Sequence, residues 1–267
     1  MSSDDIDEKA VAEECPHAAR ATGIPIREEI DSVAPVMVAP ELIPISQVER
    51  LLAPENPLRI TAAWMRAFLG RPHRELGRPG PVCPFVPGAI MQDTIWLAQV
   101  SFGPNDKQAI VEAIGMFREM FRTLEPVSGD LSMMKAIMIV FPNIDIEHAS
   151  VIDDVQAELK AKFVADGLMI GEFHERNESP GLRNENFRPL RSPIPGLAIR
   201  YMVDTDLPFL KRMTYPPPLR VEFIRSYLKR MLGPTMKGVN IDAALDALVG
   251  AEIEMRRGEN DPEGNLA

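Results

Sequence analysis

The sequence predicts an α+β fold, an α/β sandwich with a mixed β-sheet of about four or more strands and helices packed mainly on one face. Two observations carry this prediction. Short runs rich in β-branched residues alternate with longer amphipathic segments through the middle of the chain. Two more such runs then follow each other directly, before a set of helical segments near the C-terminus, an order typical of a mixed sheet.

The first elements are marked by a cap and by prolines. Ser46, with Glu49 three residues on, predicts a helix start. Two prolines interrupt this helix, which resumes over 58–69 with large apolar residues on one face. The stretch that follows, up to Pro87, is dense in proline and is expected to form a rigid, extended loop, because proline fixes φ and keeps the preceding residue out of the helical region.

The central elements follow from periodicity. A β-branched and aromatic run predicts a strand over 94–102, and an amphipathic helix is expected over 105–124. The apolar run 136–141 predicts a buried strand that Pro142 ends. Asp145 can cap the next helix, which should end before Gly167. The remaining predicted strands cover 168–173 and 197–203, and the remaining helices cover 208–213, 218–232 and 241–255.

These elements define one domain with two flanking segments. Residues 1–45 combine scattered prolines with an excess of acidic residues and show no periodic apolar face, so we expect a flexible arm. A single α+β domain is predicted over 46–256, with extra helices at both of its ends. Residues 257–267 are expected to form a disordered tail.

Composition excludes several classes of protein. A net charge of −10 over 267 residues argues against a nucleic-acid-binding protein, because that affinity comes from lysine and arginine. The longest apolar runs are far shorter than the ~20 residues that span a bilayer. The acidic N-terminus does not resemble a signal peptide. With only Cys15 and Cys83 there is no disulfide framework, so a cytoplasmic protein without membrane contact is expected.

Charge and proline are unevenly distributed. Residues 61–90 and 171–230 both carry net positive charge, and together they hold 13 of the 25 prolines. An acidic chain therefore contains two basic, proline-rich segments. This pattern predicts a rigid, basic pocket for an anionic group.

Cys83 is the strongest candidate for chemistry. It lies in a Val-Cys-Pro-Phe segment after a loop that contains several arginines. Neighbouring cations favour a thiolate, which can act as a nucleophile, a redox thiol or a ligand to haem iron. The alternative is that Cys83 is a small buried hydrophobic residue in a rigid turn.

His174 is the second candidate, because it ends a predicted strand and opens a long loop without apolar periodicity. That loop contains Arg188 and Arg191, and Arg200 follows inside an otherwise apolar strand. Arginine holds carboxylates, phosphates and haem propionates in a bidentate manner. His73, near the Cys83 segment, could face the same cavity. The alternative is a solvated basic loop in which the ring nitrogens of His174 are hydrogen-bonded within the protein.

Known motifs for other chemistries do not occur in the chain. The sequence contains no Walker loop, no Gly-x-Gly-x-x-Gly and no Gly-x-Ser-x-Gly element, and no closely spaced histidine pair typical of a non-haem metal site. Nucleotide-dependent and serine-hydrolase functions are therefore without support.

The layout resembles the YqcI/YcgG family over about residues 75–210. The resemblance rests on Val82-Cys83-Pro84-Phe85 before the first of the predicted strands, two β-α units, and Gly171-Glu172-Phe173-His174 opening a long Asn/Arg/Pro loop. The run from Pro180-Gly181-Leu182 to Pro189-Leu190-Arg191-Ser192-Pro193 is typical of a separate, uncharacterised bacterial domain family within this similarity.

The resemblance implies a haem-dependent oxygenase that hydroxylates or N-oxygenates a small amine or amino-acid-like substrate in specialised metabolism. It implies haem b, with Cys83 as the iron ligand and His174 as the alternative ligand or as a catalytic residue at the haem. The residues His73, Arg188, Arg191 and Arg200 would complete the cofactor site. An external electron donor is expected, and a homodimer is compatible with the sequence.

A second function remains open. The basic loop over Arg176–Arg200 could bind an anionic small molecule or the acidic surface of a partner, in a non-catalytic accessory protein. Cys83 would then have a structural role only. The residues by themselves support a site for an anionic ligand, and the haem prediction comes from the resemblance.

Overall fold

The computed structural model describes residues 41–232 and 240–260. Its centre is one five-stranded sheet with the strand order β1-β2-β3-β5-β4. The strands are β1 (Ile43–Pro44), β2 (Ile95–Gln99), β3 (Ala136–Val140), β4 (Leu168–Phe173) and β5 (Gly196–Tyr201). The predicted α+β class with a mixed sheet is therefore confirmed.

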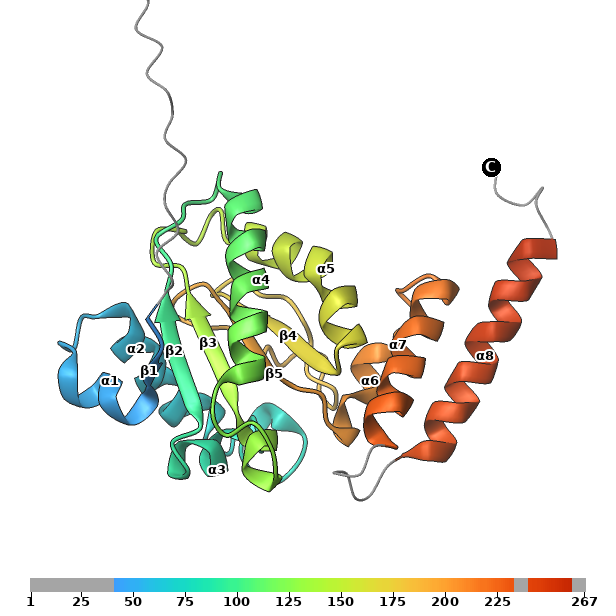
Figure 1. Cartoon of the computed structure of the whole chain (residues 1–267), viewed down its shortest axis with the longest axis horizontal. Coiled ribbons are helices and arrows are strands. Elements are labelled where there is room, and N and C mark those ends of the chain that lie inside the picture. Colours follow the sequence, from blue (N-terminus) through green and yellow to red (C-terminus); the bar gives the residue numbers. More distant parts are fainter. Residues whose placement is uncertain (1–40, 233–239, 261–267) are drawn as a thin grey trace, which may run out of the picture. The chain divides into compact units, whose positions relative to one another are not determined.

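The described helical segments surround this sheet (Figure 1). The α-helices are α1 (Ile45–Leu51), α2 (Pro57–Trp64), α3 (Val86–Met91), α4 (Lys107–Thr123), α5 (Ser150–Ala165), α6 (Leu207–Leu210), α7 (Pro217–Met231) and α8 (Ile241–Asn260). The shorter segments are the π-helix η1 (Met65–Leu69) and the 3-10 helices η2 (Arg74–Leu76), η3 (Asp130–Met134) and η4 (Asp204–Asp206). None of the described helices is long and apolar enough to cross a membrane.

Strand direction determines which loops meet. β2 and β3 are parallel and are connected through α4, whereas β5 runs antiparallel to both β3 and β4. β4 therefore points the same way as β2 and β3. The carboxyl ends of these three strands share one edge of the sheet, and the amino ends share the other.

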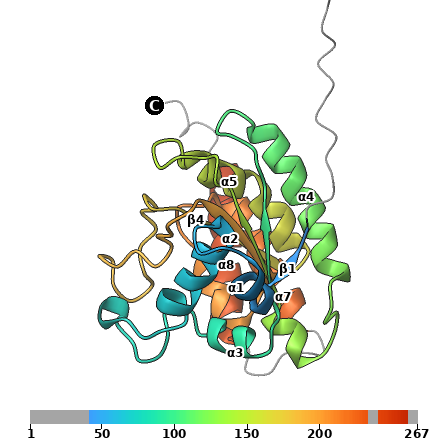
Figure 2. The same ribbon diagram turned by 90° about the vertical axis from the view of Figure 1, so that its left-hand side faces the viewer.

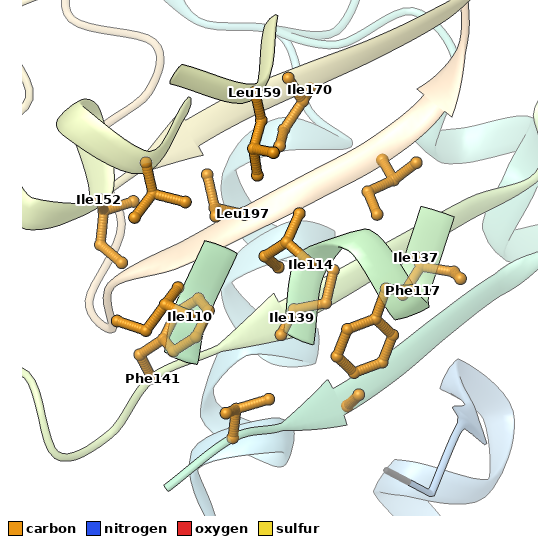
Figure 3. Close-up of a cluster of buried hydrophobic side chains, with 14 of the residues drawn as sticks. Ile110, Ile114, Phe117, Ile137, Ile139, Phe141, Ile152, Leu159, Ile170 and Leu197 are labelled. Atoms are coloured by element: carbon orange, nitrogen blue, oxygen red, sulfur yellow. The ribbon is translucent and has the colours of Figure 1, made fainter. Parts of the chain in front are cut away.

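The long helices α4 and α5 cover one face of the sheet (Figure 3). Their apolar residues, including Ile114, Phe117 and Leu159, pack against alternate strand residues such as Ile139 and Leu197 in a first core cluster. Apolar residues recur about every 3.6 positions in the helices and at every second position in the strands. Each element therefore has one apolar side, and these sides pack against each other. Each fully buried Leu, Ile or Phe contributes ~1.5–3 kcal/mol by leaving water.

The other face is also covered, by α1, α2, η1 and α3, in a second core cluster that includes Leu58, Met65, Val86 and Leu97. The prediction of helices mainly on one face is thus corrected: two long helices lie on one face and several short ones on the other. The helix predicted from Ser46 corresponds to α1, and the helix predicted over 58–69 corresponds to α2 and η1, whereas α3 lies in and just after the stretch expected to be a loop.

The C-terminal helices form a third core cluster beside α5 and the end of β5. Met202, Leu210 and Tyr227 are buried there, and α8 packs along α7. The predicted helix over 208–213 is shortened to α6, and the helix over 241–255 extends to Asn260, so the first residues of the predicted tail are helical.

Two further boundaries differ from the sequence prediction. Residues 1–40 of the predicted arm and 261–267 of the predicted tail lie outside the described residues, but Ile43 and Pro44 already pair with β2. Asp145 does not cap α5. Its Oδ1 accepts the N–H groups of Glu147 and His148 in a turn, and α5 begins only at Ser150.

Candidate functional site

The Cys83 segment is a folded-back loop. The Val82 N–H donates to the Arg71 carbonyl (2.9 Å) and the Cys83 N–H donates to the Leu69 carbonyl (2.8 Å). Pro72 and Pro81 form an isolated antiparallel bridge between the two arms of this loop. The loop is therefore held on the end of η1, which places the half-buried Cys83 thiol against the second core cluster.

Arg200 lies on the same face of the sheet as Cys83. Its neighbour Ala198 belongs to the second core cluster, and side chains two residues apart on a strand share a face. The guanidinium carbon lies 5.9 Å from the ring centre of Phe85, two residues after Cys83. Arg200 Nη1 and Nη2 donate to Oδ2 and Oδ1 of Asp206, each at 2.7 Å.

The charge of Arg200 is well stabilised. Burial alone would lower the pKa of the guanidinium, but the charge and hydrogen bonds of Asp206 raise this pKa above its ordinary value, and interaction with Cys83 adds to the rise. A permanent cation thus lies within electrostatic range of the only cysteine in the described residues.

Aromatic side chains lie around the same loop. Trp64 and Phe68 stack at 6.1 Å, and the edge of Phe173 meets Trp64 at 5.7 Å. His73 stacks on Phe187 at 4.8 Å, and Phe68 contacts both. Phe68 lies in η1, and π-helical turns of this kind occur often at functional sites.

This aromatic cluster joins segments more than 100 residues apart. The Asn184 side chain donates from Nδ2 to the Glu75 carbonyl (2.8 Å), so the loop of 174–195 is fixed to the segment around η2. Figure 2 shows the gold loop of 174–195 beside the cyan segment of 70–83. The two basic, proline-rich segments of the sequence therefore meet.

Arg188 and Arg191 both contact an acidic residue of their own loop. Both bind Glu178: Arg188 Nε donates at 3.0 Å, and Arg191 donates from Nη2. Their hydrogen bonds, that of Arg188 foremost, lower the pKa of the exposed Glu178 carboxyl. Arg191 also donates to the Asn177 carbonyl (3.2 Å). Both arginines thus form contacts within their own loop, which connect its two ends.

His174 belongs to a separate polar cluster on the α5 side of the sheet. Its Nε2 lies 3.0 Å from both carboxylate oxygens of Asp153 in α5, while Nδ1 is buried and has no partner among the described residues. Glu172, two residues earlier, accepts a hydrogen bond from Ser179 Oγ (3.3 Å). Burial raises the pKa of the Glu172 carboxyl, and the charge of Asp153 raises it further.

The predicted site residues therefore divide into two groups. Arg200 pairs with Ala136 at the amino end of β3, whereas His174 follows Phe173, which pairs with Gly196 at the start of β5. The four residue-to-residue steps from 196 to 200 separate these positions by about 13 Å along the strand. Cys83 and Arg200 lie together, His73 joins the aromatic cluster beside them, and His174 lies elsewhere with Asp153.

Sequence reasoning missed the aromatic partners and Asp153. Trp64 and Phe68 were visible as the apolar face of a helix, but nothing in that spacing connects them with Phe187 in a polar loop. Asp153 is an ordinary acidic residue in the first turn of α5. The contact of Phe187 with His73 and that of Asp153 with His174 arise only from the packing of segments that are distant in the sequence.

The carboxyl edge of the sheet carries a cleft of about 320 Å³. It is lined by Pro57, Pro142, Ile144, Asp145, Ile146, Glu175, Pro193, Ile194 and Pro195. None of the predicted site residues lines this cleft. Within the described ranges, no three His, Cys, Asp or Glu side chains gather closely enough to hold a metal ion.

Comparison with known families gives one match. The model of a family described as a domain of unknown function, DUF6875, matches residues 58–239, more than half of the chain. The matched region begins with α2 and ends before α8, so it contains the Cys83 loop, the whole of β2–β5 and the loop of 174–195. No curated protein and no solved structure matches the chain significantly.

Proposed function

We propose that this chain, which belongs to the DUF6875 family, is a haem-dependent oxygenase in which Cys83 supplies the ligand to the iron. The observation that carries the proposal is the position of Cys83. Its thiol is half-buried against an apolar and aromatic cluster, with the Arg200 cation in electrostatic range. A free cysteine held at an apolar, aromatic surface can ligate haem iron through its sulfur.

The residues around Cys83 suit a haem group chemically. Haem is flat and largely apolar, and Trp64, Phe68 and Phe187 offer aromatic surfaces beside the loop that holds the sulfur. His73, stacked on Phe187, lies on the same loop; its Nδ1 accepts the Glu75 N–H, and we assign to its Nε2 the contact with cofactor or substrate. We favour Cys83 over His174 as the ligand because the aromatic cluster and Arg200 lie around the Cys83 loop, whereas His174 lies with Asp153 on the α5 side of the sheet.

When bound, a thiolate-ligated haem activates O2, and electron donation by the sulfur favours O–O cleavage. The protein residues would hold and orient this group. Arg200 is a positioning residue, because both of its terminal nitrogens are bonded to Asp206, which holds the guanidinium near the Phe85 ring of the Cys83 segment. The substrate class that we propose is a small amine or amino-acid-like molecule, with an external electron donor, in the cytoplasm.

Absorption spectroscopy tests the proposal. Protein produced with ample haem precursor should show a Soret band, and its ferrous carbonyl complex should have the red-shifted band of thiolate ligation. Cys83→Ala should abolish that band. His174→Ala is the matched control, since it removes the other candidate ligand and should leave the ligation signature unchanged. A colourless protein that takes up no added hemin would contradict the proposal, as would a carbonyl band lost in the His174 variant alone.

The accessory function remains a second candidate because the two basic segments meet at the Asn184–Glu75 contact. Exposed Arg74 and Arg183 lie on the two segments, and Gly77 approaches Arg183 closely. If this surface binds an anionic ligand, Arg183→Glu should abolish binding of a polyanion probe such as tripolyphosphate, measured by calorimetry. Cys83→Ala should leave that binding intact, which distinguishes the two functions.

A further inference from the structure

The C-terminal helix α8 is fixed along one side only. Ala244 and Ala251 are buried against α7. Arg220 and Arg225 of α7 form ion pairs with Glu254 and Glu252 of α8. These contacts determine the rotation of α8 about its own axis, and they decide which residues it presents on the opposite side.

That opposite side carries an apolar stripe. Ile241, Leu245, Val249 and Ile253 are 36%, 45%, 57% and 44% exposed. They recur every four residues, so they form one continuous ridge along the helix. A shallow groove of about 310 Å³ runs beside the ridge, between Leu248, Val249, Glu252, Ile253 and Arg256. In Figure 1, α8 lies at the edge of the described fold, with α7 on its inner side.

The exposed charges that flank this stripe differ in sign between its two ends, while Glu252 of the groove is paired with Arg225 of α7. Asp242 and Asp246 lie near the start of α8, and Arg256 and Arg257 lie near its end, all four exposed. A parallel copy of the helix would bring like charges together. An antiparallel copy would bring the acidic end of one helix to the basic end of the other. This charge complementarity favours a second copy of α8 in the antiparallel orientation.

We propose that two copies of the chain pair through α8, antiparallel, about a two-fold axis at Val249. In this register Val249 faces its own copy, Leu245 of one chain faces Ile253 of the other, and Asp242 lies at the same end of the contact as Arg256 of the other copy. A two-fold pair is self-complementary, so one stripe supplies both sides of the interface.

The partner is thus a second copy of this chain. The proposal does not depend on the proposed function, since α8 lies beyond the residues that match the family model. Burial of four large apolar side chains per copy supplies the stabilisation, and apolar patches exposed on a folded protein commonly mark such contacts.

Light scattering coupled to gel filtration tests the oligomeric state. The full chain should elute with twice the mass of one copy. Val249→Glu places two carboxylates at the axis and should raise the dimer dissociation constant by about 100-fold, because like charges brought together cost several kcal/mol. Met91→Glu is the matched control: Met91 is 77% exposed on α3, and its variant should remain a dimer. A wild-type chain that elutes with the mass of one copy overturns the proposal.

Two further variants test the register. In a Cys15→Ser background, Val249→Cys should form an intermolecular disulfide under mild oxidation, whereas Met91→Cys should not. Asp242→Arg should weaken the dimer, and Asp242→Arg combined with Arg256→Asp should restore it. Circular dichroism verifies that each variant is folded. Dimers that persist in folded Val249→Glu, or a charge swap that restores nothing, would show that the contact lies elsewhere.

Discussion

Arg200 and Asp206 form a bidentate ion pair at the end of the interior strand β5. Both hydrogen bonds measure 2.7 Å, and Asp206 also accepts the Val203 N–H at 2.9 Å. The Asp206 side chain is almost fully buried, whereas the Arg200 side chain is partly exposed. The pair therefore has two roles: it fixes the turn that follows β5, and it holds the Arg200 guanidinium on the sheet face where Cys83 lies.

Removing the charge of Asp206 should destabilise the fold. Asp206→Asn keeps an acceptor for Val203 but leaves Arg200 without its counter-charge, and we expect a loss of about 2–3 kcal/mol, below the ~3–5 kcal/mol of a fully buried pair. Urea denaturation measures it. Asp204→Asn, in the same 3-10 turn but outside the pair, should change stability by less than ~0.5 kcal/mol. Equal effects of the two substitutions would show that the ion pair is not the cause.

Gly196 is required by close packing inside the sheet. A Cβ at this position would lie 2.7 Å from the Ile139 carbonyl oxygen and 2.8 Å from Met138 Cε. Because the carbonyl belongs to the neighbouring strand, Gly196→Ala should cost about 1–3 kcal/mol in the free energy of unfolding. Gly171→Ala on β4, where the nearest atom would be 3.5 Å away, should be neutral or slightly stabilising. A neutral Gly196→Ala would contradict the register of β3 and β5.

Glu172 should make stability depend on pH. Its pKa is raised, by burial first and by Asp153 second, from an ordinary value of 4.5. The folded state holds the proton more tightly than the unfolded state, so this residue lowers the stability as pH rises from about 4.5 through the raised folded-state pKa. Glu172→Gln should therefore match the wild type near pH 4 and exceed its stability at pH 8.

Chemical denaturation across this pH range measures the difference. Glu175→Gln, an exposed residue of the adjoining loop, is the control and should leave the pH profile unchanged. A variant whose advantage does not grow with pH would show that Glu172 titrates like an exposed carboxylate.

Asn184 should hold the loop of 174–195 in place. Asn184→Ala removes the 2.8 Å hydrogen bond to the Glu75 carbonyl, a loss of about 1 kcal/mol. Hydrogen exchange should then become roughly fivefold faster in both 73–78 and 181–188. Asn186→Ala provides the control, since Asn186 contributes its backbone N–H and not its side chain to the Asn184 contact. Faster exchange confined to 181–188 would show that the two segments are not coupled.

Much of the fold could be predicted because local periodicity carries it. The apolar residues of α4 recur at helical spacing and bury against strands that alternate with period 2, so the element types and their approximate bounds are visible in the chain. β1 and α3 were not predicted. A two-residue strand and a helix of six residues that begins with Val-Pro-Gly have too little pattern of their own, and only packing against β2 and the second core cluster stabilises them.

The candidate site was only partly predictable. The chemistry of Cys83, His174 and the arginines is visible from residue type, but their distances are not. Strand β5 inserts antiparallel between β3 and β4, which places Arg200 and His174 at opposite ends of the sheet. The loop arginines were expected to hold an external anion, and an acid in their own loop, Glu178, binds both.

The sequence by itself determined the α+β class, the alternation of core residues and the presence of two basic, rigid segments, because these depend on local pattern and on the fixed φ of proline. Tertiary structure alone decided that these segments meet, that Cys83 lies beside Arg200, and that α8 exposes an apolar ridge. Such relationships depend on strand order and on which helix face is already occupied, and both are set by contacts between residues far apart in the chain.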